Sequence, residues 1–246
     1  MKDYFLRRAE SLAKIDSPVE ARVVVMSTMR HLLQVVSYSV LEWVAARNPS
    51  PETQPQDSLL QDLLAPTDGA LVSALESLLV CAEQNGWTGA CRAILKPVEE
   101  GDGCADICGG GGETLAGLLR GLVEIRNDGG EGHGLPGDYQ REAEESALRF
   151  TIEALSGCIP RVDGGELVIG PLGGEVRIRI IRVFDGNPVL LRRVSVVNSA
   201  AIRVQAQYYD SNDALKSLSY EAWNPFSKFV GQSLPSYVQY SNEWAP

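Results

Sequence analysis

The hydrophobic periodicity of this chain changes once, near residue 158, and this change constrains the fold more than any other feature. Before it, apolar residues recur three and four positions apart, as on one face of an α-helix. After residue 165, short runs alternate apolar and polar residues, as half-buried strands do. The pattern predicts an α+β chain by segment, with an α-helical bundle of four to five helices followed by a small antiparallel β domain.

The predicted boundary divides the chain into a helical domain, 1–158, and an antiparallel β module with an aromatic C-terminal tail, 159–246. The predicted helices cover 17–47, 67–84, 113–127 and 139–155, with a shorter segment at 88–95. Ser17, Asp68 and Asp138 are the expected N-caps, and Pro18 is expected at the first position of the longest helix. The predicted strands cover 175–181, 189–197, 201–209 and 218–223. The aromatic tail either docks on the sheet or leads away from it.

The formal net charge of −10 is concentrated in the first part of the chain. Residues 161–246 carry 9 basic and 8 acidic side chains, so the first 160 residues carry 13 basic and 24 acidic ones, a net charge of −11. Non-specific nucleic-acid binding depends on the neutralisation of phosphates by basic side chains. The charge therefore argues against a broad nucleic-acid platform but does not exclude a small cleft with a few arginines.

The cysteine pattern predicts neither a disulfide framework nor a metal centre. The five cysteines are irregularly spaced, which is typical of reduced thiols in a cytosolic protein. Cys104 and Cys108 have the spacing of a zinc-ligand pair, but no second pair completes the four ligands that a structural zinc site needs. We therefore predict no metal and no cofactor.

Other enzyme classes and a membrane span find no support in the sequence. The glycine-rich segment 99–112 lacks the Lys-Ser/Thr that ends a phosphate-binding loop, since Glu113 follows Gly112. No arrangement of Ser, His and Asp indicates a catalytic triad. No apolar run approaches the roughly 20 residues of a membrane helix, and the N-terminus carries charges. We expect a cytoplasmic protein with no membrane contact.

One short segment combines residues suited to phosphate chemistry. Arg126 and Asn127 end a predicted helix, and His133 follows in a glycine-rich turn. Arg126 lies eleven residues after Leu115, so it continues the apolar stripe of that helix and is expected to point inward or at an interface. The only other histidine, His31, lies within the longest predicted helix and is interpreted as a core or helix-surface residue. An arginine beside an imidazole that titrates near neutral pH suits the cleavage of an RNA phosphodiester.

The segment Arg126, Asn127 and His133, in its helical context, resembles the HEPN superfamily of small helical domains, many of which carry an Arg-x(4–6)-His motif with a polar residue after the arginine. The resemblance covers about residues 20–157 and makes the helical domain HEPN-like. It implies a metal-independent endoribonuclease of a toxin or antiphage defence system that works as a homodimer with a composite site. By the same resemblance, His133 is the general acid/base, Arg126 stabilises charge on the phosphate, and Asn127 orients the groups.

The motif also departs from the family pattern, which leaves other functions open. Its intervening glycines can break the helix, and Asp128 and Glu131 place two carboxylates near the expected phosphate. A catalytically silent HEPN dimerisation or scaffold domain, alone or as part of a larger defence protein, is the first alternative. A non-enzymatic helical and β adaptor is the second, in which Arg126 only caps a helix and His133 lies in a loop. A protein partner at the β module is compatible with all three hypotheses.

Overall fold

The computed structural model describes residues 2–47, 49–56, 58–59, 63, 67–87, 96–98, 104, 107, 114–127 and 141–159, together with strand segments between 161 and 239. Five α-helices lie in these residues: α1 (Lys2–Ser11), α2 (Pro18–Arg47), α4 (Asp68–Gln84), α6 (Leu115–Asn127) and α7 (Arg141–Ala154). Three short 3₁₀ segments cover Leu12–Lys14, Pro51–Thr53 and Ser156–Cys158. None of the helices so described combines the length and apolarity needed to cross a membrane.

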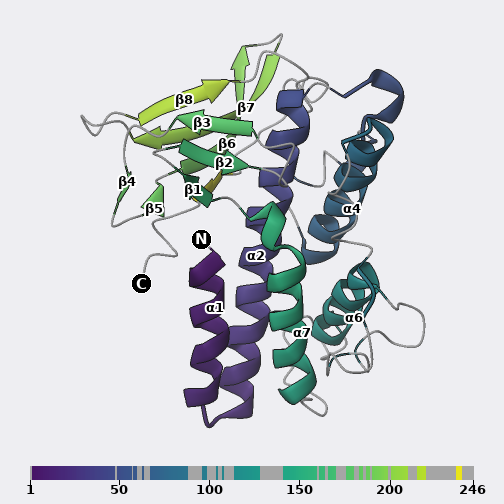
Figure 1. The fold of residues 1–246 in the computed structure, drawn as a ribbon, viewed down its shortest axis with the longest axis vertical. Helices are drawn as coiled ribbons and strands as arrows, with labels where there is room; N and C mark the ends of the chain where they lie inside the picture. Colours follow the sequence, from purple (N-terminus) through teal and green to yellow (C-terminus); the bar gives the residue numbers. More distant parts are fainter. Residues whose placement is uncertain are drawn as a thin grey trace.

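The central element is α2, which the other helices surround (Figure 1). Its N-terminal half lies between α1 and α7, and α4 packs against it near its C-terminal end. In turn, α6 packs on α4 and α7. The predicted helix 17–47 is confirmed by α2, and Ser17 accepts a hydrogen bond from the Glu20 amide at 3.3 Å, as an N-cap does.

The apolar residues of α2 account for its central position. Buried side chains occur on more than one face of this helix, as expected for a helix that is covered on several sides. They include Val25, Met29, Leu32, Leu33, Val36, Val40, Leu41 and Trp43. Trp43 also meets Trp87, which follows α4, with ring centroids 5.6 Å apart in an edge-to-face arrangement. This contact helps to hold the end of α4 against α2.

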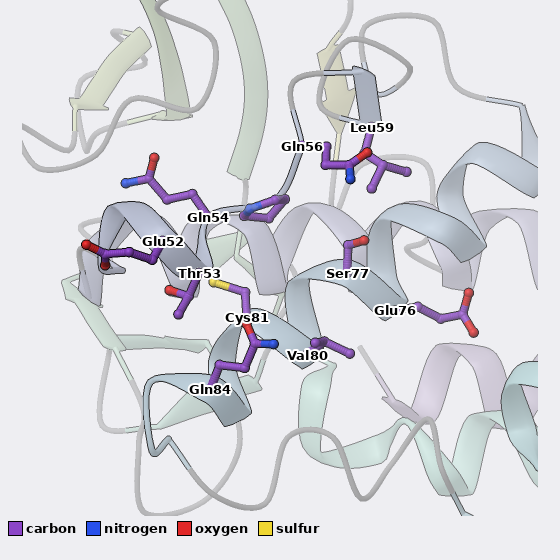
Figure 2. Close-up of a pocket in the computed structure, with 11 residues that line it drawn as sticks. Glu52, Thr53, Gln54, Gln56, Leu59, Glu76, Ser77, Val80, Cys81 and Gln84 are labelled. Carbon is purple, nitrogen blue, oxygen red and sulfur yellow. The ribbon is translucent and has the colours of Figure 1, made fainter.

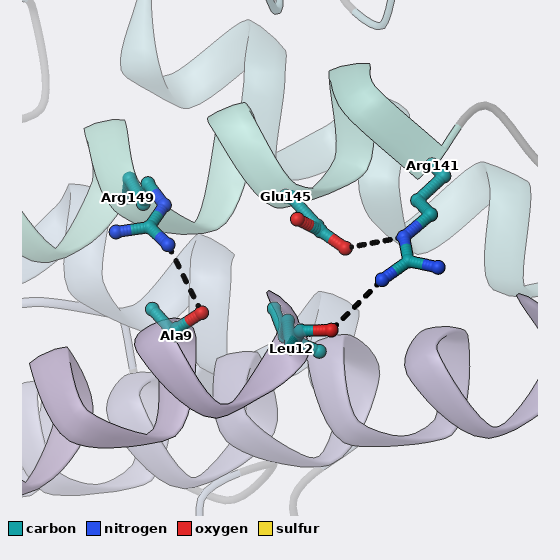
Figure 3. A network of polar contacts seen from close by, with 5 residues as sticks. All are labelled: Ala9, Leu12, Arg141, Glu145 and Arg149. Atoms are coloured by element: carbon teal, nitrogen blue, oxygen red, sulfur yellow. Dashed lines mark hydrogen bonds and ion pairs between the residues drawn. The ribbon is translucent and has the colours of Figure 1, made fainter. Parts of the chain in front are cut away.

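The first helix, α1, was not predicted, because it buries few apolar residues within a highly charged segment. Its core contribution consists of Phe5 and Ala9, with Leu12 in the turn that follows. Two arginines of α7 complete the docking (Figure 3). Arg149 donates to the Ala9 carbonyl at 3.1 Å, and Arg141 donates to the Leu12 carbonyl at 2.8 Å. The Ala9 carbonyl lies in the last turn of α1, where carbonyls lack intrahelical partners, whereas the Leu12 carbonyl also accepts from the Ile15 amide at 3.1 Å.

Two details position α4 and α6. Thr67, rather than the predicted Asp68, is the N-cap of α4, and its hydroxyl accepts from the Ala70 amide at 3.2 Å. Gly121 of α6 lies so close to Ile107 that a Cβ atom would come within 2.1 Å of the Ile107 carbonyl oxygen. Only glycine fits there, and the close approach fixes α6 on its neighbours. The predicted segment 88–95 and the predicted cap Asp138 lie outside the described residues.

Strand segments follow the helices and pair through their backbones. They are β1 (Arg161–Asp163), β2 (Glu166–Ile169), β3 (Val176–Arg179), β4 (Val183–Phe184), β5 (Asn187–Pro188), β6 (Leu190–Asn198), β7 (Ala201–Tyr209), β8 (Leu215–Ser219) and β9 (Tyr237–Gln239). The antiparallel pairings give separate sheets with the strand orders β1-β2-β3, β4-β5 and β8-β7-β6-β9.

The predicted fold class, a helical bundle followed by a small antiparallel β domain, is wrong. The part of the chain that the structure describes in full is 81% helix, in five helices and without strands. A β domain is held together by apolar side chains buried against its sheets. Every residue of the described hydrophobic core lies at or before Ile159, so the strand pairings are not shown to have a core. The fully described residues form a helical fold. The division of the chain at residue 158 stays a prediction.

Candidate functional site

The last two residues of α6 are Arg126 and Asn127, and both are exposed. A cation in the last turn of a helix is favoured by the partial negative charge of the helix C-terminus. The Arg126 side chain stays 40% exposed, while its guanidinium reaches across to α4 and forms an ion pair with Asp68. Arg126 was expected to point inward or at an interface, and its side chain lies at the edge of the core, where α6 meets α4.

Asp68 is the group around which this site is built. It is the first residue of α4, and its side chain is only 10% exposed. One carboxylate oxygen pairs with Arg126, and the other lies 3.0 Å from Nη1 of Arg30 on α2. A buried carboxylate is costly unless it is paired. Here the negative charge of Asp68 is balanced by two guanidinium groups and by the partial positive charge at the N-terminus of α4.

The charges of this cluster do not cancel. Arg30 and Arg126 contribute two positive charges and Asp68 one negative charge, so the three side chains keep a net positive charge. Partial burial, and then the charge of Arg30, lower the pKa of Arg126. Arginine nevertheless stays protonated at neutral pH.

The structure brings together only part of the predicted site. Arg126 and Asn127 are neighbours at the exposed end of α6, whereas His133 lies outside the described residues. The same holds for Asp128 and Glu131, the two carboxylates within the motif. His31 lies within α2 and is partly buried, as its interpretation as a core or helix-surface residue requires.

Asp68 and Arg30 were missed as site residues. Asp68 was predicted to be a helix cap, and no role was predicted for Arg30 within the long helix 17–47. Asp68 lies 58 positions before Arg126, and Arg30 lies 38 positions before Asp68, so no local pattern links them. The one available signal was indirect. An arginine on an apolar stripe needs a carboxylate partner, and Asp68 at the start of a neighbouring helix was a candidate.

The thiols and acidic groups form no metal centre in the described part of the chain. The thiols of Cys81, Cys104 and Cys158 are buried, and Cys91 and Cys108 lie outside the described residues. Burial raises the pKa of Cys158 to about 12, so its thiol stays protonated. Among the described residues, no three His, Cys, Asp or Glu side chains converge in a way that could hold a metal ion.

No family model, curated protein or solved structure matches this chain. The HEPN resemblance therefore depends on Arg126, Asn127, His133 and their helical context alone.

Proposed function

We propose that this protein is a metal-independent endoribonuclease of the HEPN type, acting in a toxin or antiphage defence system. The observation that carries the proposal is the Arg30–Asp68–Arg126 cluster at the exposed end of α6. It lies beside Asn127, six residues before His133. An anionic phosphate is the natural ligand of such a spot, because a guanidinium offers two parallel donors to its oxygens.

In this mechanism, each residue has a separate role. His133 accepts the proton of the ribose 2′-hydroxyl or donates one to the departing 5′-oxygen. The 2′-oxygen bonds to phosphorus as the bond to the 5′-oxygen breaks, which leaves a 2′,3′-cyclic phosphate and a 5′-hydroxyl. Arg126 stabilises the charge that develops on the phosphate oxygens. Asp68 is a positioning residue, since it holds the Arg126 guanidinium in place.

The proposed enzyme acts as a homodimer on cytoplasmic RNA, with the motifs of two copies in one composite cleft. The chain carries a large excess of acidic residues over basic ones, so most of its surface repels RNA. Weak, local binding at the arginine cluster is expected in place of a broad nucleic-acid interface.

One observation favours the alternative of a catalytically silent HEPN dimerisation or scaffold domain. Arg126 already has a carboxylate partner in Asp68. Phosphate must therefore compete with Asp68 for this guanidinium or bind to its remaining donors. We favour the ribonuclease because Asp68 pairs with two guanidinium groups, so Arg126 shares this carboxylate with Arg30.

The test is cleavage of mixed RNA by the purified chain in the presence of EDTA. His133→Ala is expected to lower the rate by about 10²–10⁴-fold, the usual contribution of a general acid/base, and Arg126→Ala is expected to abolish most of the activity. The matched control is Arg120→Ala. Arg120 lies on the same helix as Arg126, and it pairs with Glu76 of α4. It should cleave like the wild type.

The products provide a second criterion. Wild-type fragments should end in 2′,3′-cyclic phosphates. Cleavage that persists in both His133→Ala and Arg126→Ala would point to a contaminating nuclease and contradict the proposal. Absence of cleavage in the wild type at every protein concentration would favour the silent scaffold.

A further inference from the structure

A cavity of about 490 Å³ lies between the segment that follows α2 and one side of α4 (Figure 2). The first wall comes from residues 52–56 and Leu59, and the second from residues of α4 between Glu76 and Gln84. Its volume is within the range of small-ligand sites, about 300–1,000 Å³. The proposed cleavage reaction does not use this cavity.

The two walls are joined by a hydrogen-bond network centred on Asn85. Its side-chain amide donates to the Thr53 hydroxyl at 2.6 Å and to the Cys81 carbonyl at 2.8 Å, and its side-chain oxygen accepts from the Ser50 amide at 3.1 Å. Thr53 also donates to the Ser50 carbonyl at 2.9 Å. Gly86, with φ of 73°, permits the turn that places Asn85 here. Because these bonds fix the loop on α4, the cavity is preformed.

The lining suits a flat ligand with apolar faces and a polar edge. Val80 is 47% exposed and offers an apolar surface to the cavity, and Leu59 adds a second one. Gln56 and Gln84 are exposed beside them, and each amide offers donors and an acceptor in one plane. A nucleobase has this combination of apolar faces and a hydrogen-bonding edge.

The charges at the cavity favour a base over a phosphate. Among the described residues, no basic side chain lines it, and the acidic lining residues Glu52 and Glu76 lie at opposite ends in Figure 2. Glu76 is moreover engaged by Arg120 of α6. An anionic phosphate would find no partner inside, whereas an uncharged base would meet no repulsion.

The cavity and the arginine cluster lie along the same helix. Glu76 and Gln84 follow Asp68 by eight and sixteen residues, which corresponds to about 12 and 24 Å along α4. An extended RNA strand of a few nucleotides spans these distances. A strand whose phosphate lies at Arg30 and Arg126 can therefore bring a base a few nucleotides away to the cavity.

We propose that this cavity is a nucleobase subsite, which receives one unpaired base of an RNA strand whose scissile phosphate is held at the Arg30–Asp68–Arg126 cluster. The inference rests on the proposed ribonuclease function and deepens it by making the substrate single-stranded. It also assigns the selection of the cleavage site to Gln56 and Gln84.

The first test measures binding of adenosine, cytidine, guanosine and uridine to the full chain by saturation-transfer NMR. Nucleosides carry no phosphate, so this measurement is independent of cleavage. At least one nucleoside should bind, and the Gln56→Ala/Gln84→Ala double variant should bind it about tenfold more weakly, since each lost hydrogen bond contributes a few-fold. Glu83→Ala, an exposed neighbour that does not line the cavity, is the matched control and should bind like the wild type.

The second test is the sequence preference of cleavage in EDTA. The double variant should keep cleaving but with a flattened base preference, whereas Arg126→Ala should lose cleavage at every sequence. Nucleoside binding without any nuclease activity would contradict the proposed function and leave the base site standing.

Three results would overturn the subsite. The first is that no nucleoside binds the wild type, and the second is that binding and cleavage preference are unchanged in the double variant. The third is that an uncharged tetrapeptide binds as tightly as the nucleosides and that the double variant no longer binds it. The cavity would then recognise peptide amides.

Discussion

Two arginines of α6 reach carboxylates of α4, and the contrast between them is informative. Arg120 pairs with Glu76, and the two side chains are 59% and 22% exposed. Arg126 pairs with Asp68, but this carboxylate is 10% exposed and is shared with Arg30 of α2. The first pair is a one-to-one surface ion pair of the kind that contributes about 0–1 kcal/mol. In the second, one buried carboxylate holds two guanidinium groups near a helix end.

The comparison shows that residue type and helix do not determine what an arginine does. The role of an arginine is determined by its carboxylate partner, that is, by how deeply the carboxylate is buried and how many cations it contacts. In a surface pair, the two opposite charges neutralise each other. A buried carboxylate that pairs with two arginines instead holds both guanidinium groups in place.

The largest effect is expected from a change that moves α6 itself. Gly121→Ala forces a Cβ atom against the Ile107 carbonyl and should displace the helix that carries both arginines. We expect a loss of about 3 kcal/mol in the free energy of unfolding, measured by urea denaturation. Gly69→Ala is the control, because its Cβ meets only Val123 at 3.9 Å. A similar loss in both variants would show that close packing at Gly121 does not fix α6.

The next effect separates the two carboxylates. Asp68→Ala leaves Arg30 and Arg126 facing each other without their common partner, and should lower the free energy of unfolding by about 2–3 kcal/mol. The loss stays below that of a fully buried pair because both arginines are partly solvated. Glu76→Ala should cost less than about 1 kcal/mol. Equal losses in urea denaturation would remove the distinction between the two pairs.

Much of the helical layout could be predicted from the sequence. The range of α2 follows from Ser17, Pro18 and a long apolar repeat, which are local signals. The position of Arg126 and Asn127 at the end of α6 follows from the same kind of pattern. These features depend on residues that are neighbours in the sequence, so periodicity and capping rules reach them.

What the sequence did not reveal depends on contacts between distant segments. The Asp68 pairings join three helices, and α1 is held by Arg141 and Arg149 of α7. The β domain was predicted from strand alternation alone. Alternation indicates a strand but not what covers it, and a domain needs a shared apolar core.

A third carboxylate extends the comparison to pH. Glu144 of α7 is almost fully buried, with one oxygen 3.2 Å from Arg22 and the other without a hydrogen-bond partner in the described residues. Burial raises the pKa of Glu144 above its ordinary value of 4.5, and Arg22 offsets this only in part. The folded state therefore binds the proton more tightly than the unfolded state, and this contribution to stability is lost as the pH rises above about 4.5.

Glu144→Gln removes this titration. Between pH 4.5 and 7, the stability of the variant relative to the wild type should increase, as measured by urea denaturation at several pH values. A relative stability that stays constant or falls over this range would contradict the raised pKa.

The smallest effect concerns the cap that precedes Asp68. Thr67→Ala removes the hydroxyl that accepts from the Ala70 amide and should cost about 1 kcal/mol. Thr67→Ser keeps the hydroxyl and should retain most of the stability. If the two variants are equally stable by thermal unfolding, the cap does not support the start of α4.

The measurement that tests the central claim most directly is the salt dependence of RNA binding. A 2′-deoxy oligonucleotide binds without being cleaved, and each phosphate contact to a single strand contributes a slope of about −0.7 in log K against log salt concentration. Arg126→Ala and Arg30→Ala should each reduce the magnitude of the slope by about 0.7, and Arg120→Ala should leave it unchanged. If Arg120→Ala reduces the slope as much as Arg126→Ala, the arginine cluster at Asp68 is not a distinct phosphate site.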